Sequence, residues 1–438
     1  MTQSKTSNSF YASLPKIDRI DSVDHMRGFI FLLMAVDHAL HAYAANWGKY
    51  AFFRDYDRSY IFDGLYLFNQ AAIMPVLFFT FGAYILPKLN AYGIKAFWKD
   101  KFVKYIIPFM IGVPLVVPLL SFPKYSEFTD PSISYGDYLQ TVFFPHALQA
   151  GPYWVMYALT AFTVLLLLIN KLIPKLVPTL SRFIQNAFHQ PVKNIALFGL
   201  VSIVIYGLSD LRYGAPWWVG FKEILPDYLY GQLFSLQGSK YLMNFVYFVM
   251  GAAFMESKVW KSPDFRDVWI GFTSKRYFWL VCTLTFGALY VTYAHLYFHD
   301  GAYDYTMYKI IRVGGGTWDA YVDAFSHLTD KAPAVLLRTT LLAILVMMQV
   351  LTLLAFFGQN RDTSSRSFAF WSSAAACCWG IFIIHDPIMI WLQFSLISVH
   401  VDPILKILIV SLGGILPAWL ITKGLLKTPY IKRVFELD

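Results

Sequence analysis

The stretch VDHMRGFIFLLMAVDHALH, residues 23–41, combines groups suited to proton transfer and anion binding with the apolar residues of a membrane helix. A neutral histidine is the usual general base near pH 7 and could take a proton from an attacking hydroxyl. An arginine can bind a phosphate or a carboxylate through two parallel hydrogen bonds. The candidate residues of this stretch are Asp24, Arg27, Asp37, His38 and His41.

A helix over this stretch would gather most of these residues on one face. Successive residues turn by 100°, so that six positions fall within a stripe about 80° wide. Arg27 and His38 would lie about 16 Å apart along the helix axis, with His38 deeper in the membrane. Asp37 points about 100° away from His38, but it lies four residues before His41 and can pair with it. The stripe consists of Asp24, Arg27, Phe31, Met34, His38 and His41.

Ionisable groups within a membrane span are rare, because each costs about 2.5–3.5 kcal/mol at the bilayer centre on insertion scales. They usually face the bundle interior or a water-filled cavity and mark a functional site. The simpler alternative is that they hydrogen-bond between helices and stabilise packing. An arginine near the membrane edge with a histidine deeper on the same stripe favours a functional site.

The composition is that of a polytopic membrane protein. Of the 438 residues, 57% are hydrophobic and 14% are charged, whereas a soluble domain carries about 25% charged residues. Runs of about 20 apolar residues cross about 30 Å of hydrocarbon, so the sequence predicts an all-α bundle of about ten transmembrane helices. The three cysteines lack metal-ligand spacing, and we expect no metal site. The predicted spans are 26–46, 64–87, 102–121, 152–173, 195–213, 241–256, 277–298, 334–357, 368–394 and 404–424.

Lysines and arginines predict the orientation of these spans. If the N-terminus is cytoplasmic, the inner side holds 24 of the 36 lysines and arginines, as the positive-inside rule requires. We therefore expect a cytoplasmic tail at 1–23, one transmembrane domain at 24–424 and a second cytoplasmic tail at 425–438. The first residues lack an apolar core, so we expect no cleavable signal peptide. The net charge of +9 then reflects the inner loops facing membrane lipids, and no nucleic-acid partner is expected.

Three long segments on the predicted outer side are rich in tyrosine, phenylalanine and tryptophan. In one of them, the residues from Trp318 to Leu328 follow the 3–4 spacing of an amphipathic helix at the membrane surface. These segments form either an interfacial aromatic belt or a surface on which sugar rings stack. The segments are 122–150, 214–240 and 299–333.

Several stretches together resemble one known family. DHMRGFIFLLMAVDH resembles the first-helix signature of the acyltransferase-3 superfamily of membrane acyltransferases, which has an aspartate, an Arg-Gly pair and a histidine eleven residues after the arginine. KDKFVKYIIP resembles the inner loop with two basic residues three apart before a proline. WGIFIIHDPIMIWL and GPYWVMYAL are similar to a late helix with histidine and proline and to a helix opened by tryptophan. Within the family, the chain most resembles the glucan biosynthesis protein C type. The first-helix residues are Asp24, Arg27, Gly28 and His38.

This resemblance implies a membrane O-acyltransferase of the bacterial inner membrane. The acyl group, acetyl or succinyl, would move from acyl-CoA to a hydroxyl of a periplasmic or cell-surface glycan. The resemblance implies catalytic roles for His38, Arg27 and Asp24. His38 would act as the general base, or alternatively as a nucleophile that forms an acyl-histidine. His41, with Asp37 as its partner, is the second candidate base.

The inner loop at 92–108 would bind the acyl-CoA. Lys99, Lys101 and Lys104 could hold its phosphates, and Trp98 could stack on its adenine. The pair Lys101 and Lys104 stands where the family favours arginine. The alternative is that these lysines lie at the lipid headgroups, as cytoplasmic loops generally do.

His385, Trp154 and His41 are the residues expected on the substrate side. His385 lies two residues before Pro387 and would form a second polar wall facing His38. The alternative is a proline kink with a hydrogen-bonded histidine beside it. We further expect a polar tunnel, lined by Arg27, His38 and His385, through which the thioester of a cytosolic acyl-CoA reaches His38.

Two other classes of protein remain open at this stage. A proton-coupled transporter also carries charged groups and a histidine at the middle of the membrane. Inverted repeats would favour a transporter, and we find none in the sequence. A non-catalytic glycan exporter or scaffold is the other alternative. Release of CoA by the purified protein would separate the enzyme from both.

Overall fold

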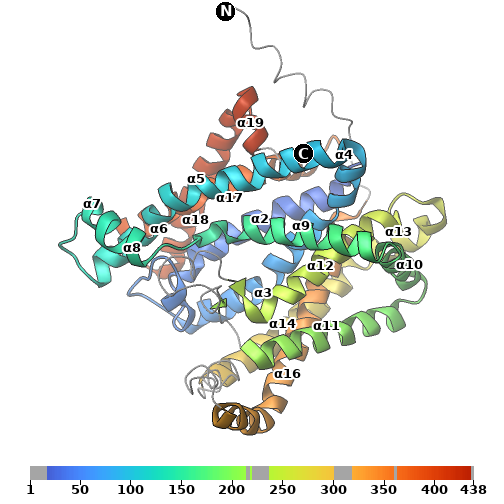
Figure 1. The fold of residues 1–438 in the computed structure, drawn as a ribbon, viewed down its shortest axis with the longest axis horizontal. Coiled ribbons are helices and arrows are strands. Elements are labelled where there is room, and N and C mark those ends of the chain that lie inside the picture. Colours follow the sequence, from blue (N-terminus) through green and yellow to red (C-terminus); the bar gives the residue numbers. More distant parts are fainter. Residues whose placement is uncertain (1–16, 214–217, 220–235, 300–317, 360–362, 436–438) are drawn as a thin grey trace, which may run out of the picture.

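The computed structural model of the protein describes residues 17–213, 218–219, 236–299, 318–359 and 363–435. Within these ranges the chain folds into a bundle of α-helices (Figure 1). It also forms one short antiparallel pair of strands, β1 (Trp218–Val219) and β2 (Leu236–Gln237). The prediction of an all-α polytopic membrane protein is confirmed, with this small addition.

Long helices occupy all of the predicted spans. They are α2 (Asp21–His41), α3 (Tyr60–Gly82), α5 (Ile107–Leu115) with α6 (Val117–Phe128), α9 (Trp154–Leu172), α11 (Pro191–Tyr213), α12 (Gly238–Ser257), α14 (Arg276–His299), α16 (Trp318–Phe357), α17 (Arg366–Ser395) and α18 (Pro403–Leu425). Shorter helices connect them: α4 (Ile85–Lys101), α7 (Tyr135–Asp137), α8 (Phe144–His146), α10 (Leu176–His189), α13 (Arg266–Ser274) and α19 (Pro429–Phe435). The remaining turns are 3₁₀-helical at η1 (Trp47–Tyr50), η4 (Gly151–Tyr153) and η6 (Pro263–Phe265), and π-helical at η2 (Phe102–Ile106) and η3 (Tyr138–Phe143).

Eight helical segments of the described chain are long and apolar enough to cross a membrane. The helices α2 and α12 fall outside this group because they carry more charged or polar residues. Helix α2 packs against α3, α17 and α18, and most of its residues are buried. Its ionisable residues Asp24, His25, Arg27 and Asp37 are buried in protein, which greatly reduces the solvation that they would lose in lipid.

Helices α2 and α17 run parallel and in close contact. His25 Nε2 lies 3.0 Å from Ser372 Oγ near the start of both helices. Further along both helices, the Gln393 side chain donates to the Ala39 carbonyl at 3.0 Å. Between these contacts a Cβ atom on Gly28 would lie only 2.8 Å from a backbone nitrogen of α17. Only glycine permits this approach. The parallel direction agrees with the predicted topology, because the first and the ninth of ten alternating spans cross the membrane in the same direction.

The other half of the bundle is built from α11, α12, α14 and α16. Helix α16 packs against both α11 and α14, and α11 also packs against α12. The short helices α10 and α13 lie together across one end of this group (Figure 1). Both belong to segments that the lysine and arginine distribution places on the cytoplasmic side.

The predicted outer segments are described only in part. Residues 122–150 form the end of α6, then α7, η3 and α8. Residues 214–217, 220–235 and 300–317 lie outside the described residues. The stretch beginning at Trp318 is helical, as its spacing predicts, and continues unbroken into the following span as α16.

Candidate active site

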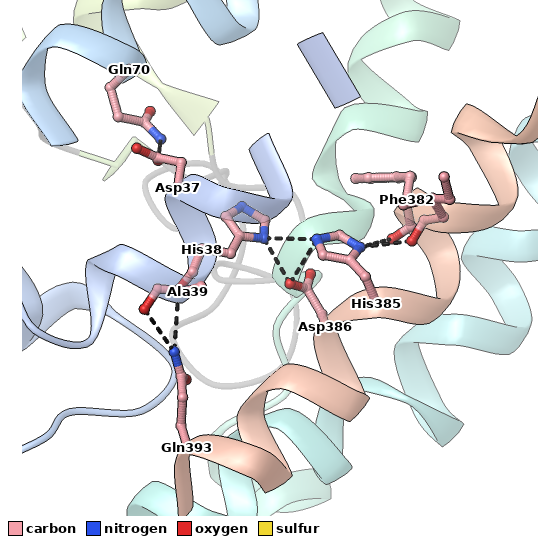
Figure 2. A network of polar contacts seen from close by, with 9 residues as sticks. Asp37, His38, Ala39, Gln70, Phe382, His385, Asp386 and Gln393 are labelled. Carbon is pink, nitrogen blue, oxygen red and sulfur yellow. Dashed lines mark hydrogen bonds and ion pairs between the residues drawn. The ribbon is translucent and has the colours of Figure 1, made fainter. Parts of the chain in front are cut away.

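His38 of α2 meets His385 and Asp386 of α17 inside the bundle (Figure 2). Its Nδ1 atom lies 2.6 Å from Asp386 Oδ1 and 3.2 Å from His385 Nε2. The two imidazole rings are nearly parallel, with their centroids 5.2 Å apart. His385 and Asp386 are buried, whereas 28% of the His38 side chain is exposed. The structure therefore joins residues from both ends of the sequence into one polar group. We name His38, His385 and Asp386 the His38 group.

The surrounding acceptors define the tautomers of both histidines. His385 Nδ1 lies 2.7 Å from the Ile381 carbonyl and 3.1 Å from the Phe382 carbonyl. A carbonyl oxygen only accepts, so Nδ1 of His385 carries the hydrogen and Nε2 of the neutral ring is an acceptor. His38 Nδ1 then faces two acceptors, the carboxylate of Asp386 and the His385 Nε2, and it must be the donor to them.

This assignment leaves the lone pair of neutral His38 on Nε2. Within the described residues Nε2 has no hydrogen-bond partner, and part of the ring is accessible. An imidazole oriented by a carboxylate at Nδ1, with a free Nε2, is the arrangement of a general base in hydroxyl activation. The negative charge of Asp386 also stabilises the imidazolium that forms when Nε2 accepts a proton.

Neighbouring groups hold α17 at this position. Gln393, two turns beyond Asp386, donates to the Ala39 carbonyl of α2 (Figure 2). Pro387 lies inside α17 and has no backbone N–H, so the regular hydrogen bond to the carbonyl four residues earlier is missing. Helix α17 continues past Pro387. His385, which was expected beside this proline, contacts His38 of α2.

His38, His385 and Asp386 also have ligand types suited to a divalent metal. One potential ligand atom from each residue lies within 4.8 Å of the others. Two imidazoles and one carboxylate occur in catalytic zinc sites, where a metal-bound histidine often donates its other N–H to a backbone carbonyl, as His385 does. Zinc bound to His38 Nδ1 would place the ring hydrogen on Nε2 and abolish the base. The two uses of the group therefore exclude each other, and a chelator separates them.

A second polar group, formed by Arg19, Asp24 and Arg27, lies nearer the start of α2, and we name it the inner polar group. Asp24 accepts a hydrogen bond from Arg27 at 3.0 Å and another from Arg19 at 2.7 Å. Arg27 is buried, and its Cζ atom lies 5.8 Å from the centroid of the Tyr84 ring. Its guanidinium also contacts the Cys378 thiol. Burial alone would lower the pKa of Arg19, but the hydrogen bond to Asp24 and the attraction of its negative charge together raise that pKa. Asp24 thus holds Arg27 in place, as its position on the stripe suggests.

The predicted basic pair of the inner loop points into the protein. Lys101 and Lys104 are buried, and Lys104 Nζ lies 2.7 Å from an Asp100 carboxylate oxygen. Lys101 Nζ lies 3.9 Å from Asp100 and 3.4 Å from the Tyr105 hydroxyl. The π-helical turn η2 begins directly after Lys101 and widens the helix there. Lys99, by contrast, is exposed.

Trp98 lies beside this pair, with its ring 5.5 Å from that of Phe97 and partly buried. The sequence did not reveal that Asp100 holds both buried lysines, because the basic spacing alone suggested free cations. An anionic ligand at this loop would therefore compete with the Asp100 carboxylate for the lysines.

Five buried aromatic side chains, which we name the aromatic layer, fill the bundle between the two polar groups. Trp379 is at its centre, 5.3 Å from Phe382, 5.7 Å from Phe81 and 5.8 Å from Tyr105 between ring centroids. Phe31 lies 5.7 Å from Phe382 and completes the layer. The Trp379 ring is fully buried, and its N–H has no hydrogen-bond partner within the described residues.

The aromatic layer lies on the course of the tunnel that we predicted. On α2, Phe31 lies one turn after Arg27 and about two turns before His38. On α17, Phe382 lies one turn before His385. Along both helices, rings of the aromatic layer therefore lie between the inner polar group and the His38 group, and the tunnel stays a prediction. The helical stripe correctly placed Phe31 between the charged residues, but the sequence did not show which rings of other helices meet it.

His41 and Asp37 lie on another side of α2 from Asp386. The His41 ring stacks on Tyr66 with centroids 4.2 Å apart, and its Nε2 lies 2.9 Å from the Trp47 carbonyl. Asp37 accepts a hydrogen bond from Gln70 at 2.6 Å and points away from the His38 group (Figure 2). Each of the two residues thus has a partner other than the one expected from their spacing.

Trp154 lies at the first turn of α9, as expected for a tryptophan that opens a helix. Its buried ring packs 6.2 Å from that of Phe78, in the core. The preceding residue, Tyr153, lies within electrostatic range of Asp386. Its buried hydroxyl has no hydrogen-bond partner in the described part of the chain.

Sequence reasoning missed Asp386 and Asp100 as members of these groups, and Tyr153 as a neighbour of Asp386. Asp386 had a local signal, since it is a carboxylate inside an apolar span beside a histidine, where ionisable residues generally have a function. Asp100 had a different local signal, as a carboxylate between Lys99 and Lys101 in the basic inner loop. No sequence signal indicated Tyr153, because its proximity to Asp386 depends on how η4, directly before α9, packs.

The fold is that of a multi-pass membrane protein, and its helical bundle holds His38, His385 and Asp386 in one polar group. Residues 20–423 match the acyltransferase-3 family, described as an acyltransferase domain, and the chain belongs to that family. It is a multi-pass membrane acyltransferase. No curated protein and no solved structure matches it. The resemblance to the superfamily is confirmed, while the glucan biosynthesis protein C subtype stays a prediction.

Proposed function

We propose that the protein transfers an acetyl or succinyl group from cytosolic acyl-CoA to a hydroxyl of a periplasmic or cell-surface glycan in a bacterial inner membrane. The observation that carries this proposal is the 2.6 Å contact between His38 Nδ1 and Asp386. It leaves Nε2 as the proton acceptor that a hydroxyl needs in order to attack a thioester. Family membership favours this enzyme over the transporter and the exporter.

In the proposed reaction the acceptor hydroxyl gives its proton to His38 Nε2 while its oxygen attacks the thioester carbonyl. The tetrahedral intermediate then expels the CoA sulfur, which takes the proton from the imidazolium. The products are a glycan ester and CoA. Asp386 remains ionised throughout and stabilises the positive charge on His38. His385, with its Nδ1 hydrogen fixed on Ile381, supplies a second acceptor that holds the His38 Nδ1–H in place.

The acyl-histidine alternative differs in its first step. His38 Nε2 would attack the thioester directly and release CoA before the acceptor binds. Exchange of labelled CoA into acyl-CoA without acceptor separates the two routes. We expect no exchange, because a general base acts only while the acceptor hydroxyl is bound.

The donor is proposed to bind at the inner polar group and the inner loop at 92–108. Arg27, Lys101 and Lys104 would supply positive charge for its phosphates, and Lys99 and Trp98 lie at the more exposed edge of the same loop. The acceptor is proposed to approach from the opposite end, where His38, His41 and Tyr66 lie near the outer end of the bundle. His385 and Trp154 were predicted on this side, and of the two His385 is the one in contact with His38.

The test uses the purified protein in lipid nanodiscs with radiolabelled acetyl-CoA or succinyl-CoA and a β-glucan oligosaccharide as acceptor. The expected result is alkali-labile label on the oligosaccharide and an equal amount of free CoA. Free CoA without labelled glycan would indicate another acceptor. No CoA release with either donor would overturn the proposal, provided that the same preparation is folded.

A further inference from the structure

A cavity of about 330 Å³ lies in the half of the bundle away from His38. Its walls come from the short helices α10 and α13 and from α3, α11, α12, α14 and α16. Almost all of its lining is apolar, and Lys275 is its one charged side chain. Its volume lies in the range of small-molecule sites, about 300–1,000 Å³.

The cavity reaches about as deep as one leaflet of a bilayer. Tyr247 and Met347 both line it, and each lies ten residues before the end of its helix, at Ser257 and Phe357. A helix rises 1.5 Å per residue, so these side chains lie about 15 Å from the helix ends. Half of a hydrocarbon core of about 30 Å is the same depth. Both helix ends belong to the side predicted to be cytoplasmic.

Polar groups are arranged along the cavity in a definite order. Lys275 is exposed at its mouth, directly before α14 begins. Trp279 lies one helical turn deeper, and the backbone bond from Trp279 N–H to the Lys275 carbonyl places both side chains on one face of the helix. The Trp279 indole N–H is buried and has no hydrogen-bond partner among the described residues.

Tyr247 lies deeper still on the wall formed by α12. The residue is 2% exposed, and its hydroxyl has no hydrogen-bond partner among the described residues. A buried polar group without a partner costs about 1–3 kcal/mol. The unpartnered groups of Trp279 and Tyr247 therefore indicate that a ligand with oxygen acceptors belongs in this cavity.

We propose that this cavity binds one acyl chain of an anionic glycerophospholipid from the inner leaflet. A phospholipid has its groups in the matching order, with a phosphate at the surface, ester carbonyls one step deeper and then an apolar chain. Lys275 would bind the phosphate, and Trp279 would donate its N–H to an ester carbonyl. The chain would lie along apolar side chains such as Phe198 and Phe254. This site is independent of acyl transfer at His38.

A photo-cross-linking experiment tests the site without measuring activity. The full-length protein is placed in phosphatidylcholine vesicles that contain a trace of phosphatidylglycerol or phosphatidylcholine with a diazirine in the acyl chain. After illumination, the labelled peptides are identified by mass spectrometry. We expect label at residues 183–198 and 268–279. The phosphatidylglycerol probe should exceed the phosphatidylcholine probe about fivefold, the discrimination expected from one lysine at an anionic headgroup.

Two variants and one control separate the parts of the proposal. Ala187→Trp fills the cavity and should remove label from both peptides. Lys275→Gln should reduce labelling by the phosphatidylglycerol probe to the level of the phosphatidylcholine probe. Lys171→Gln removes an exposed lysine on the same side that does not line the cavity, and it should change nothing.

Equal labelling by the two probes in the unmodified protein would overturn the proposal. So would a fivefold preference that persists in Lys275→Gln. This second variant changes an exposed side chain and keeps the test valid even if Ala187→Trp fails to fold.

Discussion

At the scale of single residues, the site depends on one carboxylate that directs one imidazole. Asp386 fixes the hydrogen of His38 on Nδ1, and Nε2 is left to accept a proton. Asn in place of Asp386 could donate its amide N–H to Nδ1 and move the ring hydrogen to Nε2, which would remove the base. We expect Asp386→Asn to lower kcat by about 10²-fold or more while the affinity for acyl-CoA stays the same.

The matched control for this variant is Asp37→Asn, which changes a buried carboxylate on the residue next to His38. Asp37 bonds to Gln70 instead of the His38 group, so its loss should leave kcat within about threefold, well below the 10²–10⁴ of general base catalysis. Equal losses in the two variants would show that buried charge in this region matters for folding and not for the orientation of His38.

The metal-binding potential of the same group leads to a second prediction. If His38 acts as a base, its Nδ1 must be occupied by hydrogen, and a metal there would block the reaction. We therefore expect dialysis against EDTA to leave the transfer rate unchanged and added Zn²⁺ to inhibit it. A rate that falls with EDTA and returns with Zn²⁺ would instead assign the three residues to a catalytic metal.

Which single residues matter could be read from the sequence only in part. Asp24, Arg27 and His38 share a stripe because helix geometry is local and periodic. The partner of His38 is 348 residues away along the chain. Its contact depends on the register of α2 against α17, which the close approach at Gly28 allows. No spacing rule within one helix could supply that pairing.

At the scale of elements, the aromatic layer lies between the two polar groups, where an acyl group moving from the proposed donor site to His38 would pass. Trp379→Ala would remove the ring at the centre of the layer, and we expect longer acyl-CoA donors such as hexanoyl-CoA to gain at least about tenfold in kcat/KM relative to acetyl-CoA. Removing a buried tryptophan typically destabilises a protein by about 3–5 kcal/mol. The comparison is therefore made as a ratio of two donors on the same folded preparation.

Trp379→Phe serves as the control for this prediction, since it keeps an aromatic ring in the layer. Its donor ratio should stay close to that of the unmodified protein. If Trp379→Ala shows the same donor ratio as the unmodified protein, the acyl group does not pass the layer at this residue.

The elements themselves were the most predictable part of the fold. Runs of about 20 apolar residues define membrane helices directly, and all of the predicted spans are helical. The short helices α10 and α13 were not predicted, because their segments are too short to span the membrane and only their lysines and arginines entered the prediction. The aromatic layer could not be predicted, because it combines rings from α2, α3, η2 and α17 whose mutual rotation only packing decides.

At the scale of the whole molecule, the bundle separates a proposed donor side from a proposed acceptor side. The donor side depends on two lysines that Asp100 already holds. The triple variant Lys101→Gln, Lys104→Gln and Asp100→Asn removes the two positive charges together with the carboxylate that they contact, and so keeps the local charge closer to neutral. We expect CoA affinity to fall at least about tenfold, since a hydrogen bond to a charged group contributes about 1.5–3 kcal/mol.

Isothermal titration with CoA measures this change, and Asp100→Asn alone is the matched control. The single variant removes the carboxylate that would compete with CoA for both lysines, and it should bind CoA at least as tightly as the unmodified protein. Unchanged affinity in the triple variant would place the donor phosphates elsewhere on the inner surface.

The rate of acyl transfer by His38→Ala tests the central claim most directly. Purified His38→Ala, the exposed-histidine control His146→Ala and the unmodified protein are compared in nanodiscs with radiolabelled acetyl-CoA, with matched thermal stability. The account predicts that His38→Ala loses about 10²–10⁴-fold in rate, the usual contribution of a general base, while His146→Ala is unaffected. A His38→Ala rate above about a tenth of the unmodified rate would contradict the account.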